Sequence, residues 1–437
     1  MNYKKLKKHF SLAVSLLAGA VMTLSACSAD DLDEYSTSTD GTSQTSYTYT
    51  MIATGQVNTY DKDGNAVTVA EGDACYGQDG NYLAGAEMSF TKNGDGTVTD
   101  NNSGLMWQEI PTSQDFTYAD AQAYCDSLNL AGYGDWRVPT LKELFSIANF
   151  NVGWPYIDLD VFSLASGEIS KDEQYWSCNA YVGVTAEGGE NAVFGVNEVT
   201  GHIKAYAGSM PEGGMPDDLG AGGPQGTDDE GTGFPPPPGA DTGGSFNNPM
   251  LKYVRAVRST DASKGYGEND FVANGDATVT DKATGLMWSQ DDDGVGMEWE
   301  AALAYAESST LAGYTDWRLP NIKELESIAD YNYSPSATDE AHLGAALNPD
   351  FFNCTPIVNE AGNDDYGYYW SSTSARFNID GAYSYAWYYA AGRAVNNEGV
   401  DFHGAGAVRF DTKYDGGDLG EGGERYTNFV RLVRNVK

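Results

Sequence analysis

The chain has 437 residues, with 63 acidic against 25 basic side chains and a formal net charge of −38 at neutral pH. So strong a negative charge repels nucleic acids, anionic lipids and sulfated polysaccharides, which excludes them as main partners. Hydrophobic residues make up 41% and aromatic residues 12% of the sequence, which is enough to build a core and excludes disorder for most of the chain.

Residues 1–27 are typical of a bacterial lipoprotein signal peptide. Four lysines precede an apolar run from Phe10 to Leu24 that is too short for a resident transmembrane helix. The run ends in Leu24-Ser25-Ala26-Cys27, which resembles a lipobox, whose cysteine is acylated and becomes the new N-terminus. An ordinary secretory signal cleaved near Ala26 is the alternative. We expect lipidation at Cys27, which leaves a mature chain with a charge of −42 because the four leader lysines are lost.

The residues after the leader predict where the protein resides and how it is attached. Ser28 follows the cysteine, as in proteins that enteric-type bacteria sort to the outer membrane, so we expect a lipid-anchored outer-membrane protein on its periplasmic or surface face. Residues 28–50 are rich in Ser, Thr and Asp and predict a disordered tether. Residues 51–89 predict a short β-hairpin segment. In it, Asp61-Lys-Asp63-Gly64 indicates a hairpin turn rather than a calcium loop, because the twelfth position of an EF-hand is Gly72.

An internal repeat dominates the rest of the chain. Residues 90–151 align without gaps with residues 271–332, with 31 identities in 62 positions. The repeat defines copy one, residues 90–258, and copy two, residues 271–434. Residues 207–249 of copy one are rich in Gly, Pro and Asp and predict a disordered insertion.

The elements of each copy can be predicted in chain order. The segment NGDGTVTD, or NGDATVTD in copy two, favours a β-hairpin. A helix is expected at 118–128 and at 299–309. A second helix is expected after Thr140, with Glu143 as the third residue of a capping box, and after Asn321, with Glu324 in the same role. Short strands are expected at 175–177, within 191–206 and at 253–258, with counterparts at 369–371, within 382–396 and at 429–434.

The cysteines suggest one disulfide. Cys125 aligns with Ala306 and Cys178 with Ser372, so both are missing from copy two together. This joint absence is what a Cys125–Cys178 disulfide predicts in an exported protein, although coincidence would give the same pattern. Cys75 and Cys354 could pair or stay free. No zinc-ligand spacing is present in the sequence.

The succession NGDGTVTDNNSGLMWQ, AGYGDWRVPTLKEL, YWS and YVRAVR resembles the Lcl C-terminal-like domain family, and both copies match. The family is named after part of a collagen-like bacterial surface adhesin, which implies attachment or ligand recognition, in one member of polyanionic glycans. The net charge of this chain argues against that ligand class. The Trp-Arg-Val-Pro-Thr-x-x-Glu stretch is also similar to formylglycine-generating-enzyme-like domains, which have a C-type-lectin-like fold.

These resemblances imply an α+β protein with two tandem C-type-lectin-like domains, each with two helices on small irregular antiparallel sheets, joined by long Gly/Asp-rich loops. The enzyme's copper chemistry is not implied, because its cysteine pair has no counterpart. No cofactor is expected. Calcium is conceivable at the acidic loops, but the usual lectin calcium motifs are missing.

Two groups of residues stand out as structural or functional candidates. The repeated motifs predict core anchors, ion pairs and helix caps rather than a site, and their members are Trp107, Asp135, Trp136, Arg137 and Glu143 in copy one and Trp288, Asp316, Trp317, Arg318 and Glu324 in copy two. Within each copy the aspartate and arginine beside the second tryptophan are expected to pair. Ligand contacts are more plausible where the copies differ, and the candidates are Tyr383, Tyr385, Trp387, His403 and Arg409.

These features together predict a non-enzymatic surface lipoprotein that binds an unknown glycan or protein ligand and contacts the membrane through its N-terminal lipid. A structural spacer or envelope-assembly subunit is the alternative. A hydrolase-type enzyme is a more remote one, because only four histidines are present and none lies in a suggestive Ser-His-Asp or Cys-His spacing.

Overall fold

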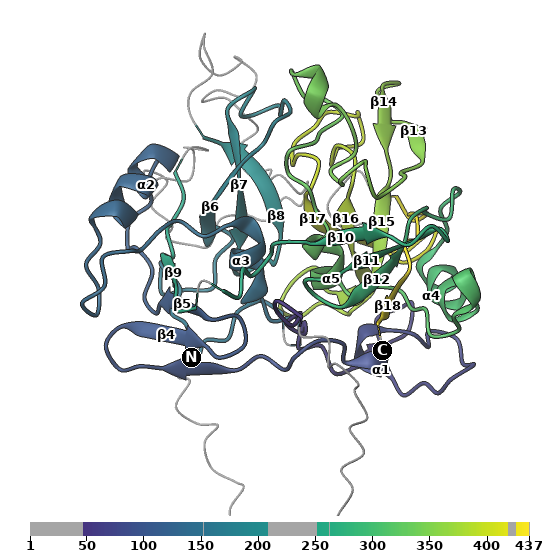
Figure 1. Cartoon of the computed structure of the whole chain (residues 1–437), viewed down its shortest axis with the longest axis horizontal. Coiled ribbons are helices and arrows are strands. Elements are labelled where there is room, and N and C mark those ends of the chain that lie inside the picture. The colour runs from purple at the N-terminus through teal and green to yellow at the C-terminus, as the bar shows by residue number, and fades with distance from the viewer. Residues whose placement is uncertain (1–46, 152, 209–250, 262, 418–424, 437) are drawn as a thin grey trace, which may run out of the picture. The chain divides into compact units, whose positions relative to one another are not determined.

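The computed structural model describes residues 47–151, 153–208, 251–261, 263–417 and 425–436 (Figure 1). The leader with Cys27, nearly all of the predicted tether and nearly all of the predicted insertion lie outside these residues. Within the described ranges, no helix is long and apolar enough to cross a membrane.

Each copy begins and ends in a four-stranded antiparallel sheet. In copy one the order is β3 (Phe90–Lys92), β4 (Thr97–Asp100), β5 (Leu105–Gln108) and β9 (Val257–Ser259), and in copy two it is β10 (Phe271–Ala273), β11 (Thr278–Asp281), β12 (Leu286–Ser289) and β18 (Val433–Asn435). The predicted hairpins are confirmed. In the turn between β3 and β4, Gly94 and Gly96 have φ of 78° and 87°, which glycine adopts without strain, whereas copy two places Ala277 at the second position with φ of 67°.

Two helices per copy follow, as the sequence predicts. The first is α2 (Tyr118–Ser127) in copy one and α4 (Trp299–Glu307) in copy two, and the second is α3 (Leu141–Ser146) or α5 (Ile322–Ser327). Both second helices begin with the predicted capping box. The side chain of Thr140 or Asn321 accepts a hydrogen bond from the third helical amide, and the glutamate at that position accepts one from the cap amide.

The copies share one six-stranded antiparallel sheet with the order β15-β16-β17-β8-β7-β6. Copy one contributes β6 (Gln174–Ala180), β7 (Ala192–Asn197) and β8 (Ile203–Ala207), and copy two contributes β15 (Tyr368–Ala375), β16 (Tyr385–Ala390) and β17 (Val408–Thr412). The sheet can be followed across the middle of Figure 1, where β8 and β17 are its two central strands. The described residues accordingly form a single compact unit, whereas the sequence predicts two tandem domains.

The contact between the copies is related by an approximate twofold axis. Ile203 pairs with Val408, and these two residues occupy equivalent positions in β8 and β17. Near the helices, Lys142 Nζ donates to the Ser327 carbonyl at 2.7 Å, and its equivalent Lys323 donates to the Ser146 carbonyl at 2.7 Å. Such reciprocal contacts are the mark of an isologous interface, here built within one chain.

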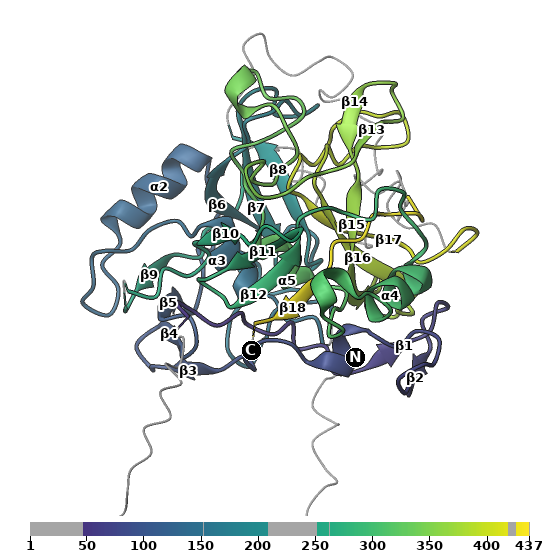
Figure 2. The same ribbon diagram turned by 45° about the vertical axis from the view of Figure 1, so that its right-hand side comes forward.

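The segment before copy one packs mainly on copy two. It contains the hairpin of β1 (Thr59–Tyr60) and β2 (Ala66–Val67), which confirms the predicted hairpin turn, and the short helix α1 (Asp79–Tyr82). Gln56 bonds the backbone of Ser374 in β15 through both ends of its amide, at 2.9 and 2.8 Å. Figure 2 shows β1 and β2 close to α4.

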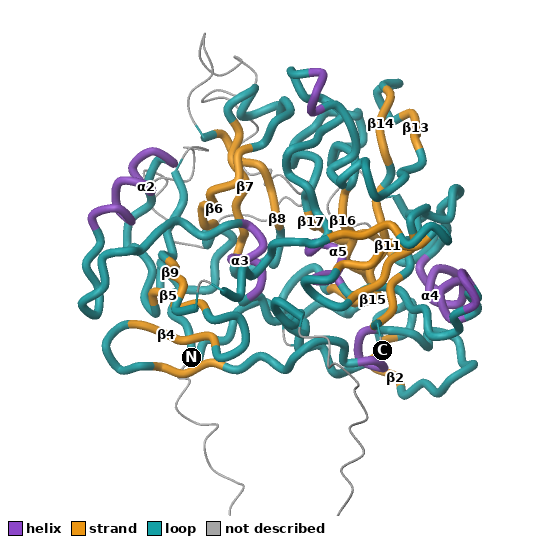
Figure 3. The backbone as a smooth tube through the Cα atoms, in the orientation of Figure 1, coloured by secondary structure: helices purple, strands orange, loops and turns teal. Residues whose placement is uncertain are grey.

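The predicted α+β class with few helices and several small antiparallel sheets is confirmed, and Figure 3 shows how much of the chain lies in loops. A further hairpin, β13 (Pro356–Val358) with β14 (Asp364–Tyr366), projects from copy two. The strand expected at 253–258 is shorter than predicted, since β9 covers only Val257–Ser259. The residues before it pass between sheets, where Tyr253 bridges Tyr175 and Val254 bonds Thr112.

Candidate functional site

The repeated tryptophans are core residues, as predicted. Trp107 and Trp288 are fully buried at equivalent places in β5 and β12, and Trp136 and Trp317 are buried beside the first helix of their copy. None of the four offers a face to a ligand.

The ion pairs beside these tryptophans differ from the prediction. Arg137 does not pair with Asp135. Instead it forms two bonds of 2.6 Å to Glu143, the capping-box acid, whereas Asp135 pairs with Arg258 at 2.7 Å. The pairing changes because Arg137 bridges β9 through its backbone, which brings Arg258 beside Asp135.

Copy two repeats the arrangement: Arg318 pairs with Glu324, and Asp316 with Arg434. The Arg318 side chain is only 6% exposed, against 43% for Arg137. The aromatic ring of Tyr82, from the segment before copy one, lies 5.8 Å from the Arg318 guanidinium carbon.

Sequence reasoning missed one buried arginine in each copy. The alternation in Tyr-Val-Arg-Ala-Val-Arg suggests that Arg255 faces solvent, yet it is fully buried and forms two bonds of 2.7 Å to Glu198. Its counterpart Arg431 is also fully buried and donates to the hydroxyl of Tyr369 and to backbone carbonyls. A signal was available, because both copies carry an arginine at the same position of this motif.

The ligand-contact candidates of copy two, which include the aromatic residues from 383 to 387, do not form the exposed face that the sequence led us to expect. Tyr385, Trp387, His403 and Arg409 are all buried. Tyr383 is half-buried and stacks on Tyr60 at a centroid distance of 4.1 Å. The run lies in β16, a central strand covered on both sides, so the alternate residues that would face solvent on an edge strand also pack inward.

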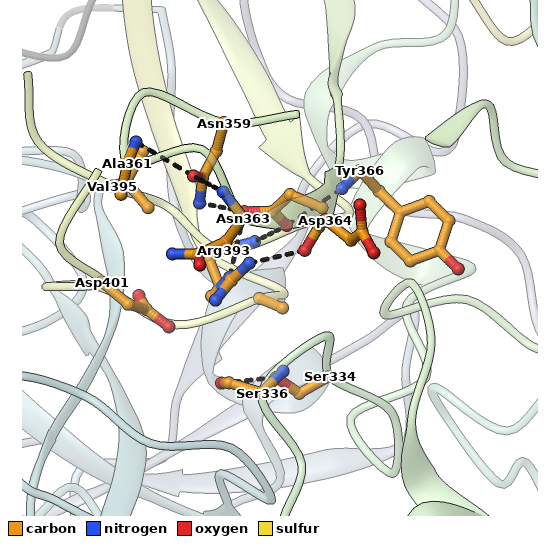
Figure 4. Close-up of polar contacts among 12 residues, drawn as sticks. Ser334, Ser336, Asn359, Ala361, Asn363, Asp364, Tyr366, Arg393, Val395 and Asp401 are labelled. Carbon is orange, nitrogen blue, oxygen red and sulfur yellow. Dashed lines mark hydrogen bonds and ion pairs between the residues drawn. The ribbon is translucent and has the colours of Figure 1, made fainter. Parts of the chain in front are cut away.

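The loops of copy two beyond the sheet form a hydrogen-bonded network, shown in Figure 4. The buried carboxylate of Asp365 accepts bonds from Arg393 Nε at 3.0 Å and from Asn359 Nδ2 at 3.0 Å. Asp401, Ser334 and Ser336 lie below Arg393 in this view. The network locks the β13–β14 hairpin to the loop at 393.

The same loops meet copy one at Tyr181. Its hydroxyl donates to Asp401 Oδ2 at 2.9 Å and lies 2.8 Å from Ser334 Oγ. Burial raises the pKa of Asp401 to about 7, against the opposing effect of bonds from the Gly404 amide and from Tyr181. These donors and acceptors satisfy one another, so we assign the cluster to holding the copies together.

The four cysteines of the described part are free thiols, so the predicted disulfide between Cys125 and Cys178 is not formed in the structure. The reason is their different surroundings. Cys125 is sealed among apolar residues of α2 and the adjoining sheet, whereas the side chain of Cys178 faces solvent. Cys75 is buried and donates to Glu300 at 2.7 Å, and Cys354 lies 3.8 Å from Arg431.

The acidic loops mostly serve internal contacts. Asp292 accepts bonds from Thr355 and from the Tyr369 hydroxyl, and Asp293 accepts bonds from the amides of Gly296 and Val430. In the ranges that the structure covers, no group of three or more His, Cys, Asp or Glu side chains is placed to hold a metal ion.

A shallow groove beside α2, largely open to solvent, is the candidate ligand site. It has a volume of about 640 Å³ and is lined by Gln114, Asp115, Phe116, Thr117, Asp120, Ala123, Tyr124, Ser127 and Leu251. The rings of Phe116 and Tyr124 lie 5.5 Å apart and form its aromatic part. Carboxylate, amide and hydroxyl groups lie around them, and none of the described lining residues is basic.

The fold fixes these side chains from two directions. The backbone of Phe116 forms a pair of hydrogen bonds with the backbone of Lys252, at 2.8 and 3.0 Å. These bonds tie the start of α2 to the segment that leads into β9. Thr117 caps α2 and donates to Asp120 at 2.7 Å, and Gln108 donates to the Tyr124 hydroxyl at 2.8 Å.

Sequence reasoning did not single out this groove, although a comparison of the copies carries a signal. Gln114 and Asp120 correspond to Val295 and Ala301 in copy two. Two polar lining residues of copy one are therefore apolar in copy two, whereas Thr117 and Ser127 correspond to the polar residues Glu298 and Ser308.

Comparison with protein families identifies the class of both copies. The model of the Lcl C-terminal domain matches residues 96–211 and 277–434. These segments cover more than half of the chain, which therefore belongs to the Lcl C-terminal domain family. No curated protein and no solved structure shows a significant match to the chain.

Proposed function

We propose that the protein is a non-enzymatic, lipid-anchored protein of the bacterial outer membrane that binds a glycan or protein ligand through the groove beside α2. The groove carries the proposal, because it brings the aromatic rings of Phe116 and Tyr124 together with hydrogen-bonding side chains of α2 and of the residues just before it. The lipobox-like sequence ending in Cys27 supports the anchor.

Charge narrows the class of ligand. Asp115 and Asp120 line the groove, and the chain as a whole is strongly acidic. A polyanion would be repelled both at long range and at the site, so the ligand we expect is neutral or cationic.

Equivalent alanines on α2 and α4 allow a matched test. Ala123 is exposed and lines the groove, and Ala304 is exposed at the equivalent position of copy two. Ala123→Arg puts a long side chain into the groove without touching the core, whereas Ala304→Arg makes the same change on the other helix. Both variants should fold like the wild type.

Binding of residues 28–437 is measured on a glycan array and, in parallel, against envelope proteins, and affinities for the ligands found are then measured by calorimetry. We expect Ala123→Arg to weaken binding at least about tenfold and Ala304→Arg to leave it unchanged. Equal binding by both variants would place the ligand elsewhere on the molecule.

The anchor is tested separately. Incorporation of a labelled fatty acid and recovery in the outer-membrane fraction should both be lost in Cys27→Ser. Incorporation that survives this substitution would contradict lipidation at Cys27.

A structural role in the envelope is the second candidate. It is favoured by the shared sheet, which makes the two copies and the segment before them one unit rather than two separately mobile modules. A protein with this role should bind no glycan selectively on the array. It should still be recovered together with envelope proteins, and Ala123→Arg in the groove should not weaken that association.

A further inference from the structure

A small cavity lies between the two copies where α3 packs against α5. Its volume is about 10 Å³, close to the space that one water molecule needs. Charged, hydroxyl and apolar groups line it, and they come from four parts of the chain: Tyr49, Met51, Lys142, Phe145, Ser146, Tyr266, Gly267, Lys323, Glu326 and Ser327.

The approximate twofold axis explains why two lysines meet here. Lys142 donates to Asn269 Oδ1 at 2.8 Å and to the Ser327 carbonyl at 2.7 Å. Lys323 makes the equivalent bond to the Ser146 carbonyl. An ammonium group has three hydrogens to donate, and the two bonds of Lys142 leave one of them over.

Glu326 breaks the symmetry, because its equivalent in copy one is Phe145. One of its carboxylate oxygens accepts a bond from the Tyr331 hydroxyl at 2.8 Å. No lysine nitrogen of this cluster forms an ion pair with it among the described residues. Lys142 and Glu326 therefore both line the cavity without direct contact, whereas Lys323 donates to the carbonyls of Ala53 and Ser146.

The hydroxyl of Tyr49 supplies an independent observation. This residue is only 4% exposed and lines the cavity, and its hydroxyl makes no hydrogen bond of good geometry in the described structure, although the Gly267 backbone lies near it. A buried hydroxyl left without a partner costs free energy, so such groups in folded proteins generally bond to protein or to ordered water.

We propose that the cavity is a hydration site in which one bound water molecule accepts a hydrogen bond from Lys142 and links it to Glu326 and Tyr49. A water molecule has two hydrogens to donate and two lone pairs that can accept hydrogen bonds. It can therefore bond to the remaining hydrogen of Lys142, to the carboxylate of Glu326 and to the hydroxyl of Tyr49. It joins copy one, copy two and the segment before copy one at a single point.

The electrostatics of the cluster agree with this assignment. Burial raises the pKa of Glu326 to about 7, partly opposed by Lys142, and burial lowers the pKa of Lys323 to about 7. Around the cavity, Asp330, Asp281 and Asp100 add negative charge, and Tyr266 contributes a further buried hydroxyl. A neutral ligand that can both donate and accept suits such a site better than an ion of either sign.

A high-resolution crystal structure of residues 28–437, with a second crystal soaked in bromide, tests the proposal directly. We expect one well-ordered water within hydrogen-bonding distance of Lys142 Nζ, the Glu326 carboxylate and the Tyr49 hydroxyl, and no anomalous bromide signal. An empty cavity, or a bromide peak in it, would overturn the assignment.

Solution measurements provide a second test with matched variants. Glu326→Phe installs the residue of copy one and fills the cavity, whereas Glu326→Gln keeps an acceptor of the same size. Magnetic relaxation dispersion of water nuclei should show one long-lived internal water fewer in Glu326→Phe and no loss in Glu326→Gln. An unchanged count in Glu326→Phe would refute the proposal, and the wild-type crystal decides the matter if that variant does not fold.

Discussion

Glu143 and Glu324 allow the effect of burial on an ion pair to be measured within one molecule. Each is the third residue of a capping box, and each accepts two bonds of 2.5–2.6 Å from the arginine six residues earlier. Both carboxylates are buried. The arginines differ, because the side chain of Arg137 is 43% exposed and that of Arg318 only 6%.

Glutamine is the informative replacement because it removes the charge and keeps an oxygen that can accept the bond from the cap amide. In Glu143→Gln, Arg137 can turn toward water, so we expect a loss of about 1 kcal/mol in the free energy of unfolding. In Glu324→Gln, Arg318 stays buried without its counter-charge, and breaking a buried pair in this way costs about 3–5 kcal/mol. The difference is a large part of the total stability of a typical domain.

The assay is equilibrium unfolding in urea at pH 7, followed by tryptophan fluorescence, with the slope compared among the three proteins. The shared sheet makes one cooperative transition the expectation, so both variants report on the same equilibrium. Equal losses would refute the reasoning that the exposure of the arginine decides the cost. A variant in which Tyr82 is replaced by alanine should expose Arg318 and reduce the effect of Glu324→Gln.

Three further outcomes are expected. The raised pKa of Asp401 means that the folded protein holds the carboxyl proton more tightly than the unfolded chain does, so the free energy of unfolding should fall as the pH rises from 3.8 to about 7. Thermal melts across this pH range measure the fall. The variant Asp401→Asn should lack the part of it that is due to this residue. In the native protein, a thiol reagent should modify Cys178 first and leave Cys125 unreacted, because burial raises the pKa of Cys125 to about 12; reaction of neither thiol until a reductant is added would instead indicate a disulfide. Trp107→Ala and Trp288→Ala should each cost about 3–5 kcal/mol in urea unfolding, since both rings are fully buried at equivalent positions, and a clearly smaller loss for one would show that the copies contribute unequally to the core.

Structural features that depend on a few neighbouring residues, such as hairpin turns and helix caps, could be predicted from the sequence. The Asn-Gly and Asp-Gly steps predict the β3–β4 and β10–β11 hairpins, and the Thr140 and Asn321 capping boxes predict where α3 and α5 begin. The physics of a turn or a cap lies within four or five residues, so the pattern alone determines it. The repeat was equally plain, because it requires only that one part of the chain be compared with another.

Contacts between distant residues were decided only by the tertiary structure. The pairing of Ile203 with Val408 joins two sheets into one, and it turns the aromatic run around Trp387 from an exposed candidate into core. The same holds for the partners of charged residues: Arg255 finds Glu198, and Lys142 reaches the end of the opposite helix.

The sequence by itself thus determined the repeat, the helix starts, the hairpins and the family, because these depend on neighbouring residues or on similarity. The groove beside α2, the exposure of each arginine and the cavity between the copies depend on how the copies meet. Burial and ion pairing are set by which surfaces come together, and that information is spread over residues far apart in the chain.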